Sequence, residues 1–296
     1  MRSLLFCICL LMFASTVNFG QSLISPDSTA MQIQKIGNQT EFKFIAHLLH
    51  NNLVNEAQYE ILRLDTIKEN SVNFTDSLWY YKGIFKYQKK DYSQAFVFFS
   101  NVSNQSSAEI WSTSKILQYH SILRKPNIGS PSSSLSKIEN IANNVFLNAT
   151  TLLLNHNPNT FDSLLKKTNI DFFQRKNLMM ISDKIVSHNP KSPIKAAVLS
   201  AVIPGLGKWY GGSRTEASSL FIICSIMAVQ ALEGYSKQAF KSPQFYIYSS
   251  LFTIFYGGGI LGSFYSVKNK EKRFYEDIDR QVFDILDIHA RKITHL

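Results

Sequence analysis

Apolar residues recur at three- and four-residue intervals through the chain between about Gln39 and Val186, which is the spacing of one face of an α-helix. No stretch of alternating apolar and polar residues, as expected for a half-buried β-strand, competes with this pattern. The pattern predicts helices near 78–88, 91–102, 108–123, 136–154, 160–167 and 171–186, with Asp91 as the N-cap of the second. We therefore expect an all-α fold.

One predicted helical pair carries small and aromatic residues at regular offsets. In LWYYKGIFKYQKKDYSQAFVFFSNV, Leu78 to Val102, small residues stand where two helices would cross closely and aromatic residues surround that crossing: Trp79, Gly83, Tyr92, Ala95 and Phe99. This pattern resembles a tetratricopeptide repeat, and a fainter copy at 44–64 has Ala57 and Ile61 in the positions of Ala95 and Phe99. The resemblance implies a degenerate helical-repeat domain that binds a protein or peptide. A plain helical bundle is the alternative.

Long apolar runs occupy the two ends of the chain. The first twenty residues combine Arg2, an apolar core and a polar end, as in a secretory signal peptide, with an uncleaved N-terminal anchor as the alternative. Residues 217–235 and 244–267 are each long enough to cross a bilayer, for which about 20 residues are needed. We expect a signal peptide at 1–20, a helical-repeat soluble domain at 21–187 with an internal break at 125–135, a membrane domain at 188–267 and an amphipathic helical tail at 268–296.

A further apolar segment, SPIKAAVLSAVIPGLGKWYGG, runs from Ser192 to Gly212. Only residues 196–207 are free of charge, and as a helix they would measure about 18 Å against a hydrocarbon core of about 30 Å. The segment therefore either crosses as a short, strained helix or turns back at Pro204-Gly205 as a re-entrant segment. In both cases the backbone groups freed at the turn need cover, so we expect the turn to pack against one of the two spans.

Charge distribution bears on the number of crossings. Counting the short segment as a third crossing places Lys208, Arg214 and the four basic residues of 268–273 in the cytoplasm, against four basic residues outside. This agrees with the tendency of Lys and Arg to remain cytoplasmic, so we expect three crossings. Within the last span, Gly258 and Gly262 offer a smooth face for close helix contact.

The short segment also carries a motif, K-A-x-x-x-S-A-x-x-P-G-x-G-x-x-Y-x-G, formed by Lys195, Ala196, Ser200, Ala201, Pro204, Gly205, Gly207, Tyr210 and Gly212. It resembles an uncharacterised small membrane domain that is common in exported proteins of Bacteroidetes. The resemblance covers about residues 190–275 and implies no known activity.

Candidate chemistry is sparse. The seven histidines have no metal-ligand spacing, and no nucleophile, P-loop or dinucleotide motif is present. The net charge of +10 is spread thinly, without an Arg-rich stripe or an aromatic platform for nucleic acid. We expect no enzyme activity, no cofactor, no metal and no nucleic-acid partner.

These patterns together predict a membrane-anchored interaction or scaffold protein. We expect it in the cytoplasmic (inner) membrane of a bacterial cell envelope, with its N-terminal soluble domain outside the cytoplasm. The alternative is a subunit of a membrane transport or envelope-assembly complex in which the Pro-Gly segment lines a polar path.

Overall fold

The computed structural model describes residues 40–67, 71–125, 127, 140–168 and 170–294, so the predicted signal peptide lies outside the described residues. All regular elements in these ranges are helices, which confirms the all-α prediction. The chain divides into two compact units. Unit 1 comprises residues 1–139 and 290–296, and unit 2 comprises residues 140–289.

Unit 1 is built from successive antiparallel helices. A helix at 40–50 is followed by α3 (Val54–Asp65), α4 (Val72–Gln88), α5 (Tyr92–Asn101) and α6 (Ala108–Arg124). The predicted N-cap is confirmed, because the Asp91 carboxylate accepts a hydrogen bond from the backbone N–H of Gln94 at 3.2 Å. Ala290 and Ile293, in the last turns of α14, join the apolar core of this unit.

The small residues of the repeat-like pair lie where α4 meets α5. A Cβ atom on Gly83 would lie 2.4 Å from the ring of Phe99, and Ala95 and Phe99 are fully buried. Trp79 and Tyr92 lie at the margin instead: Trp79 is half-buried and stacks on Phe98, and Tyr92 packs edge-on against Tyr87. In the fainter copy, Ala57 and Ile61 are also buried.

Unit 2 begins with three helices, α8 (Ile141–Leu154), α9 (Pro158–Lys167) and α10 (Arg175–Ser187). They pack on the second half of α14 (Pro243–Thr294), where Phe146 contacts the ring of His289 and Lys184 bonds Gln281. The apolar face of that half, predicted from its periodicity, is buried at Ile278 and Val282. These contacts group residues 140–187 with α14 in the second compact unit, which begins at residue 140; the expected domain boundary at 187 stays a prediction.

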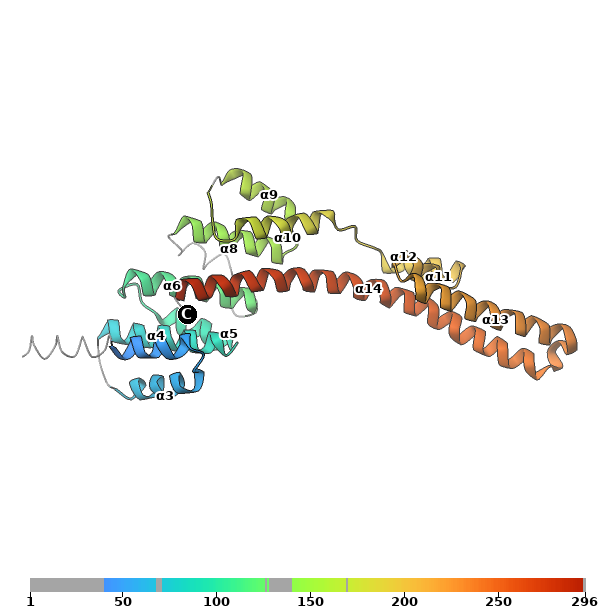
Figure 1. Cartoon of the computed structure of the whole chain (residues 1–296), viewed down its shortest axis with the longest axis horizontal. Coiled ribbons are helices and arrows are strands. Elements are labelled where there is room, and N and C mark those ends of the chain that lie inside the picture. Colours follow the sequence, from blue (N-terminus) through green and yellow to red (C-terminus); the bar gives the residue numbers. More distant parts are fainter. Residues whose placement is uncertain (1–39, 68–70, 126, 128–139, 169, 295–296) are drawn as a thin grey trace, which may run out of the picture. The chain divides into compact units, whose positions relative to one another are not determined.

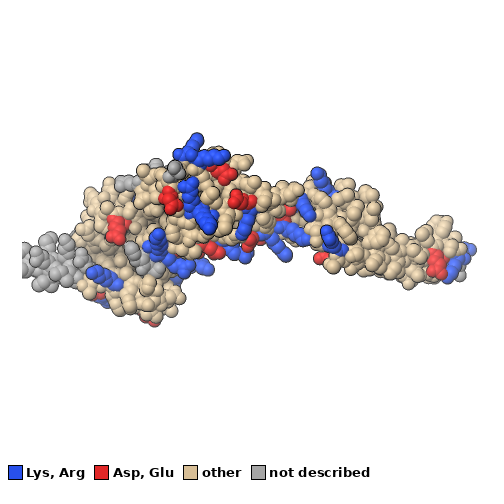
Figure 2. All heavy atoms as spheres, turned by 45° about the horizontal axis from the view of Figure 1, so that its top comes forward, with Lys and Arg blue, Asp and Glu red and all other residues tan. Residues whose placement is uncertain are grey.

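The other half of unit 2 is an apolar helical hairpin. α13 (Arg214–Gln238) runs to a short 3₁₀ turn, η2 (Ala239–Lys241), and the first half of α14 returns beside it (Figure 1). The side-chain amide of Gln244 donates to Gln230 near the turn, and Gly259 packs on Leu220 further along. On the face seen in Figure 2, charged side chains gather at the two ends of the hairpin and leave the length between them almost bare.

The last helix, α14, extends well beyond the hairpin. It has 52 residues and is about 78 Å long. It runs on past residue 267 without a break, so the expected span at 244–267 and residues 268–294 of the expected tail form one continuous helix, and the last two residues of that tail lie outside the described residues.

Candidate functional site

The motif segment is a helix that breaks and folds back on itself. α11 (Pro193–Val202) ends before Pro204, and α12 (Leu206–Tyr210) begins after Gly205, whose φ of 89° suits glycine. A Cβ on Gly207 would lie 1.8 Å from the carbonyl oxygen of Ala196, so α12 lies directly against α11. A straight helix would separate these two residues by about 16 Å. α11 has ten residues and measures about 15 Å, and α12 returns beside it, which is the geometry of the re-entrant alternative; the expected third crossing stays a prediction.

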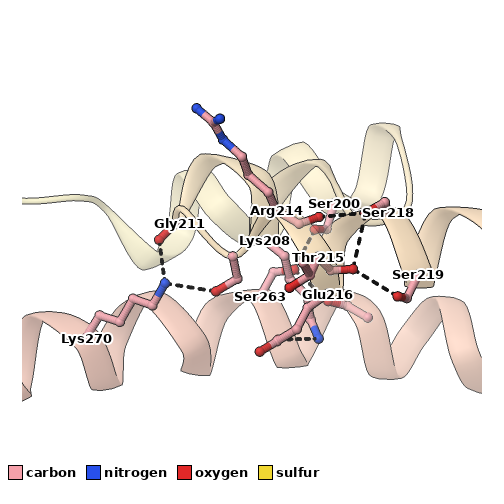
Figure 3. A network of polar contacts seen from close by, with 12 residues as sticks. Ser200, Lys208, Gly211, Arg214, Thr215, Glu216, Ser218, Ser219, Ser263 and Lys270 are labelled. Carbon is pink, nitrogen blue, oxygen red and sulfur yellow. Dashed lines mark hydrogen bonds and ion pairs between the residues drawn. The ribbon is translucent and has the colours of Figure 1, made fainter.

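A chain of buried hydrogen bonds joins this folded-back segment to α14 (Figure 3). The backbone N–H of Gly207 donates to Ser200 Oγ at 3.0 Å, and Ser200 Oγ lies 2.7 Å from Ser263 Oγ. Ser263 donates its single hydroxyl hydrogen to the carbonyl of Gly259 at 2.8 Å, so Ser200 is the donor in the serine pair. Both serine hydroxyl hydrogens in this series of hydrogen bonds have an acceptor. The backbone N–H of Gly207, which the helix break leaves without a helical partner, has one too.

The turn itself is covered by the two hairpin helices, as expected for backbone groups that cannot face lipid. A Cβ on Gly205 would lie 2.4 Å from the carbonyl oxygen of Ala217, in the first turn of α13. On the other side, the hydroxyl of Tyr256 on α14 donates to the carbonyl of Ala201, which the helix break has freed.

The glycines of the last span have different roles from those predicted. A Cβ on Gly258 would have no neighbour within 4 Å, whereas a Cβ on Gly259 would lie 2.5 Å from Leu220 of α13. Gly262 lies beside the side chain of Lys208. The close-contact face is therefore Gly259-x-x-x-Ser263, one residue further along than the predicted Gly258-x-x-x-Gly262. The hydrogen bond between Ser200 and Ser263 fixes this rotation of α14.

The remaining motif residues lie at the two ends of the folded-back segment. The hydroxyl of Tyr210 accepts a hydrogen bond from the backbone N–H of Ser192 at 3.3 Å, which ties the end of α12 to the start of α11. Gly212 has a φ of 84°, and Ala196 is fully buried. Lys195 and Ala201 are exposed. Most of the motif thus consists of positions needed to fold the segment back.

Several basic residues cluster where the hairpin meets the rest of unit 2. The ammonium group of Lys191 donates to the carbonyl of Tyr210 at 2.7 Å, and that of Lys270 donates to Gly211 and to the hydroxyl of Ser213 (Figure 3). Lys208 pairs with Glu216 at 3.1 Å. Sequence reasoning missed Ser263, Tyr256 and Lys270, although a serine and a tyrosine inside an apolar run are signals of internal hydrogen bonding.

A second polar contact joins α10 to α14 beyond the hairpin. His188, the C-cap of α10, places Nε2 2.7 Å from Glu271 Oε2 and stacks on Phe274 with ring centroids 3.7 Å apart. The other oxygen of Glu271 accepts from the backbone N–H of Lys191 at 3.0 Å. Burial alone would raise the pKa of the Glu271 carboxyl, but the hydrogen bonds from His188 and Lys191 outweigh it and lower the pKa below its usual value.

Chemistry of other kinds is sparse. Across the described ranges, no three His, Cys, Asp or Glu side chains come together in a way that could hold a metal ion. Comparison of the chain with protein-family models, with curated proteins and with solved structures finds no match.

Proposed function

We propose that this chain is a membrane-anchored interaction or scaffold protein. The observation that carries the proposal is the apolar surface of the hairpin. In the most apolar windows of α13 and α14 only 17% and 11% of residues are buried, so these are not core helices of a soluble fold. Large side chains such as Leu232 and Ile254 are about two-thirds exposed, at 68% and 67%. α13 alone is about 37 Å long, enough to cross the hydrocarbon core.

The hairpin crosses twice in this proposal, and the folded-back segment dips into one face. Two crossings return the chain to its starting side, and the contact between His188 and Glu271 supports this, because these residues flank the apolar segments. The helices α8–α10 and the second half of α14 then share one side of the membrane. The short loop around Lys237 and Lys241 lies on the other side.

We place the helices outside the hairpin on the exported side of the membrane, because the chain begins with a segment that resembles a signal peptide. Basic residues near the hairpin favour the opposite side, because the bias counts Lys and Arg within about 15–20 residues of a crossing, and in this proposal the leader outweighs them. The loop between the crossings is short, and it carries Lys237 and Lys241. In this proposal the protein lies in the cytoplasmic membrane, and the leader is the basis for the exported side.

Unit 1 supplies the proposed binding surface for a protein or peptide partner. Its helices expose large apolar side chains: Tyr59 and Leu62 lie three residues apart on α3, and Phe44 and Val97 lie on other helices. Exposed apolar and aromatic residues on successive helices are typical of surfaces that bind other proteins.

The alternative, a transport subunit with a polar path along the Pro-Gly segment, has less support. The polar groups of the turn are occupied by one another through Gly207, Ser200 and Ser263, and the turn is closed by Ala217 and Tyr256. Groups that are satisfied within the protein favour a structural role for the motif.

Membrane extraction tests the anchoring proposal. We expect the full chain, produced in bacteria, to remain in the membrane pellet at alkaline pH and to be released only by detergent. A matched variant with Ile226→Gln and Val229→Gln on the exposed face of α13 should be extracted more readily. Release of the unaltered protein by alkali or salt alone would refute an integral hairpin.

A further inference from the structure

Two lysine ammonium groups converge on one glycine at an end of the hairpin. A Cβ built on Gly212 would lie 4.0 Å from the Nζ atom of Lys191 and 4.0 Å from that of Lys270. Their partners are adjacent carbonyls, of Tyr210 and Gly211, which hold the two ammonium groups close together. Gly212 is exposed and has no side chain, so the space above it is open to a ligand.

The Glu271 carboxylate attracts the charge of Lys191, but it does not pair directly with either ammonium group. In the described parts of the chain neither Lys191 nor Lys270 forms an ion pair, and the neighbouring Glu271 is engaged by His188 and by a backbone N–H. Each ammonium has three hydrogens, of which Lys191 uses one and Lys270 two in the contacts above. Two donors of Lys191 and one of Lys270 are left for a ligand, and an oxyanion is what such donors bind.

The position along the hairpin points to lipid as the source of that oxyanion. Trp209 and Tyr265 are exposed at this end, where aromatic side chains mark the headgroup region of a bilayer. Arg214 lies over the Trp209 ring, and in Figure 3 its guanidinium extends away from the polar network. The far end differs, since Lys237 there is paired with Glu233 at 2.6 Å.

We propose that Lys191 and Lys270, converging on Gly212, bind the phosphate of an anionic phospholipid. The inference rests on the proposed membrane hairpin and adds a ligand class to it. Each basic residue near an anionic surface contributes about fivefold in affinity, so the site should prefer anionic over zwitterionic lipid by tenfold or more.

Native mass spectrometry of the detergent-purified full chain is the test. With an equimolar mixture of phosphatidylglycerol and phosphatidylcholine, we expect retention of phosphatidylglycerol, and a loss of about tenfold or more in the double variant Lys191→Gln, Lys270→Gln. The matched variant Lys237→Gln, Lys241→Gln removes the same charge from the far end and should retain the lipid. An equal loss of phosphatidylglycerol binding in both double variants would overturn the proposed site.

A second pair of variants keeps the lysines in place. Gly212→Asp and Gly212→Asn introduce similar strain, since both residues tolerate positive φ, but only Asp adds a negative charge between the ammonium groups. We expect Gly212→Asp to lose the lipid and Gly212→Asn to keep most of it. If both behave alike, the lysines do not recognise an anion here.

Two further experiments distinguish a lipid phosphate from free phosphate, and the lipid site from the anchoring proposal. Inorganic phosphate should not displace the lipid at equal concentration, because the acyl chains add contacts with the hairpin. Complete displacement would make this a free-anion site and overturn the lipid assignment. Alkaline extraction of the same variants distinguishes the membrane-hairpin proposal from the lipid-site proposal. Variants that stay in the membrane but lose the lipid support both. Unaltered protein that resists extraction but shows no preference for anionic lipid overturns only the lipid site.

Discussion

His188 and Glu271 are separated by 83 residues that include both apolar helices of the hairpin, yet His188 Nε2 and Glu271 Oε2 lie 2.7 Å apart. The pair closes the base of the hairpin with a stacked ring, Phe274, and a backbone hydrogen bond from Lys191. Because one residue precedes the hairpin and the other follows it, the contact requires the chain to return to its starting side. An even number of crossings follows wherever the hairpin enters a membrane.

Removal of the Ser200 hydroxyl should destabilise the folded-back segment. Ser200→Ala leaves the buried N–H of Gly207 without an acceptor and deprives Ser263 of a donor, and an unsatisfied buried group costs about 1–3 kcal/mol. Thermal unfolding of the purified protein in detergent measures the loss. Ser219→Ala is the control, because Ser219 is exposed and bonds only to its own helix. Equal stability of the two variants would show that the buried chain of hydrogen bonds contributes little.

Gly207→Ala should be among the most disruptive single methyl additions in the hairpin. The new Cβ would meet the backbone of Ala196, which cannot move without separating α11 from α12, at a cost of about 1–3 kcal/mol or more. The control is Gly258→Ala, where a methyl group meets nothing within 4 Å and a better helix former is introduced. Thermal unfolding should rank Gly258→Ala at or above the unaltered protein. The reverse order would contradict the described packing.

The helices themselves could be predicted because their signals are local. Asp91 caps α5 as expected, and apolar periodicity places the helices near 108–123 and 160–167 to within a few residues. The need for cover at Pro204-Gly205 could also be predicted, since an exposed turn in lipid would leave backbone groups unpaired.

Relationships between distant residues could not be predicted in this way. The return of α12 against α11 depends on the close approach of Gly207 to Ala196, which hydropathy does not reveal. The contact face of α14 differs from the predicted one by one residue, because the bond between Ser200 and Ser263 sets its rotation. Both features depend on contacts between residues that are far apart in the sequence, and the periodicity of apolar residues does not reveal which residues make them.

Ala95→Leu should overpack the crossing of α4 and α5. Ala95 is fully buried at the crossing where Gly83 approaches the Phe99 ring closely. The larger side chain should therefore cost about 1–3 kcal/mol of stability. Hydrogen exchange of the full chain should show faster exchange in peptides from α4 and α5. Gln94→Leu, at the exposed neighbouring position, should leave exchange there unchanged. Unchanged exchange in Ala95→Leu would mean that the crossing has room to spare.

Glu271→Gln should lower the stability of the folded protein at neutral pH, and it should weaken the dependence of that stability on pH in the acidic range. The pKa of Glu271 is lower in the folded protein than in the unfolded chain, so its contribution is present above the unfolded value and is lost as pH falls through the folded one. The difference from the unaltered protein should therefore begin to shrink as pH falls below about 4 and vanish only below the lowered folded pKa. Thermal unfolding across this range measures it, with the exposed Glu276→Gln as control. A difference that persists in acid would mean that charge on Glu271 is not its source.

Accessibility of single cysteines in intact cells tests the central claim, that the chain before the hairpin and the chain after it lie on one side of the membrane. With Cys7, Cys9 and Cys224 replaced by serine, cysteine is placed at Asn159 on α9, at Ser236 near the hairpin turn, or at Asp284 on α14, all of them exposed. A thiol reagent that cannot cross the cytoplasmic membrane should label positions 159 and 284 alike, and position 236 only after the membrane is permeabilised. Labelling of position 159 without position 284 would place them on opposite sides and contradict the two-crossing hairpin.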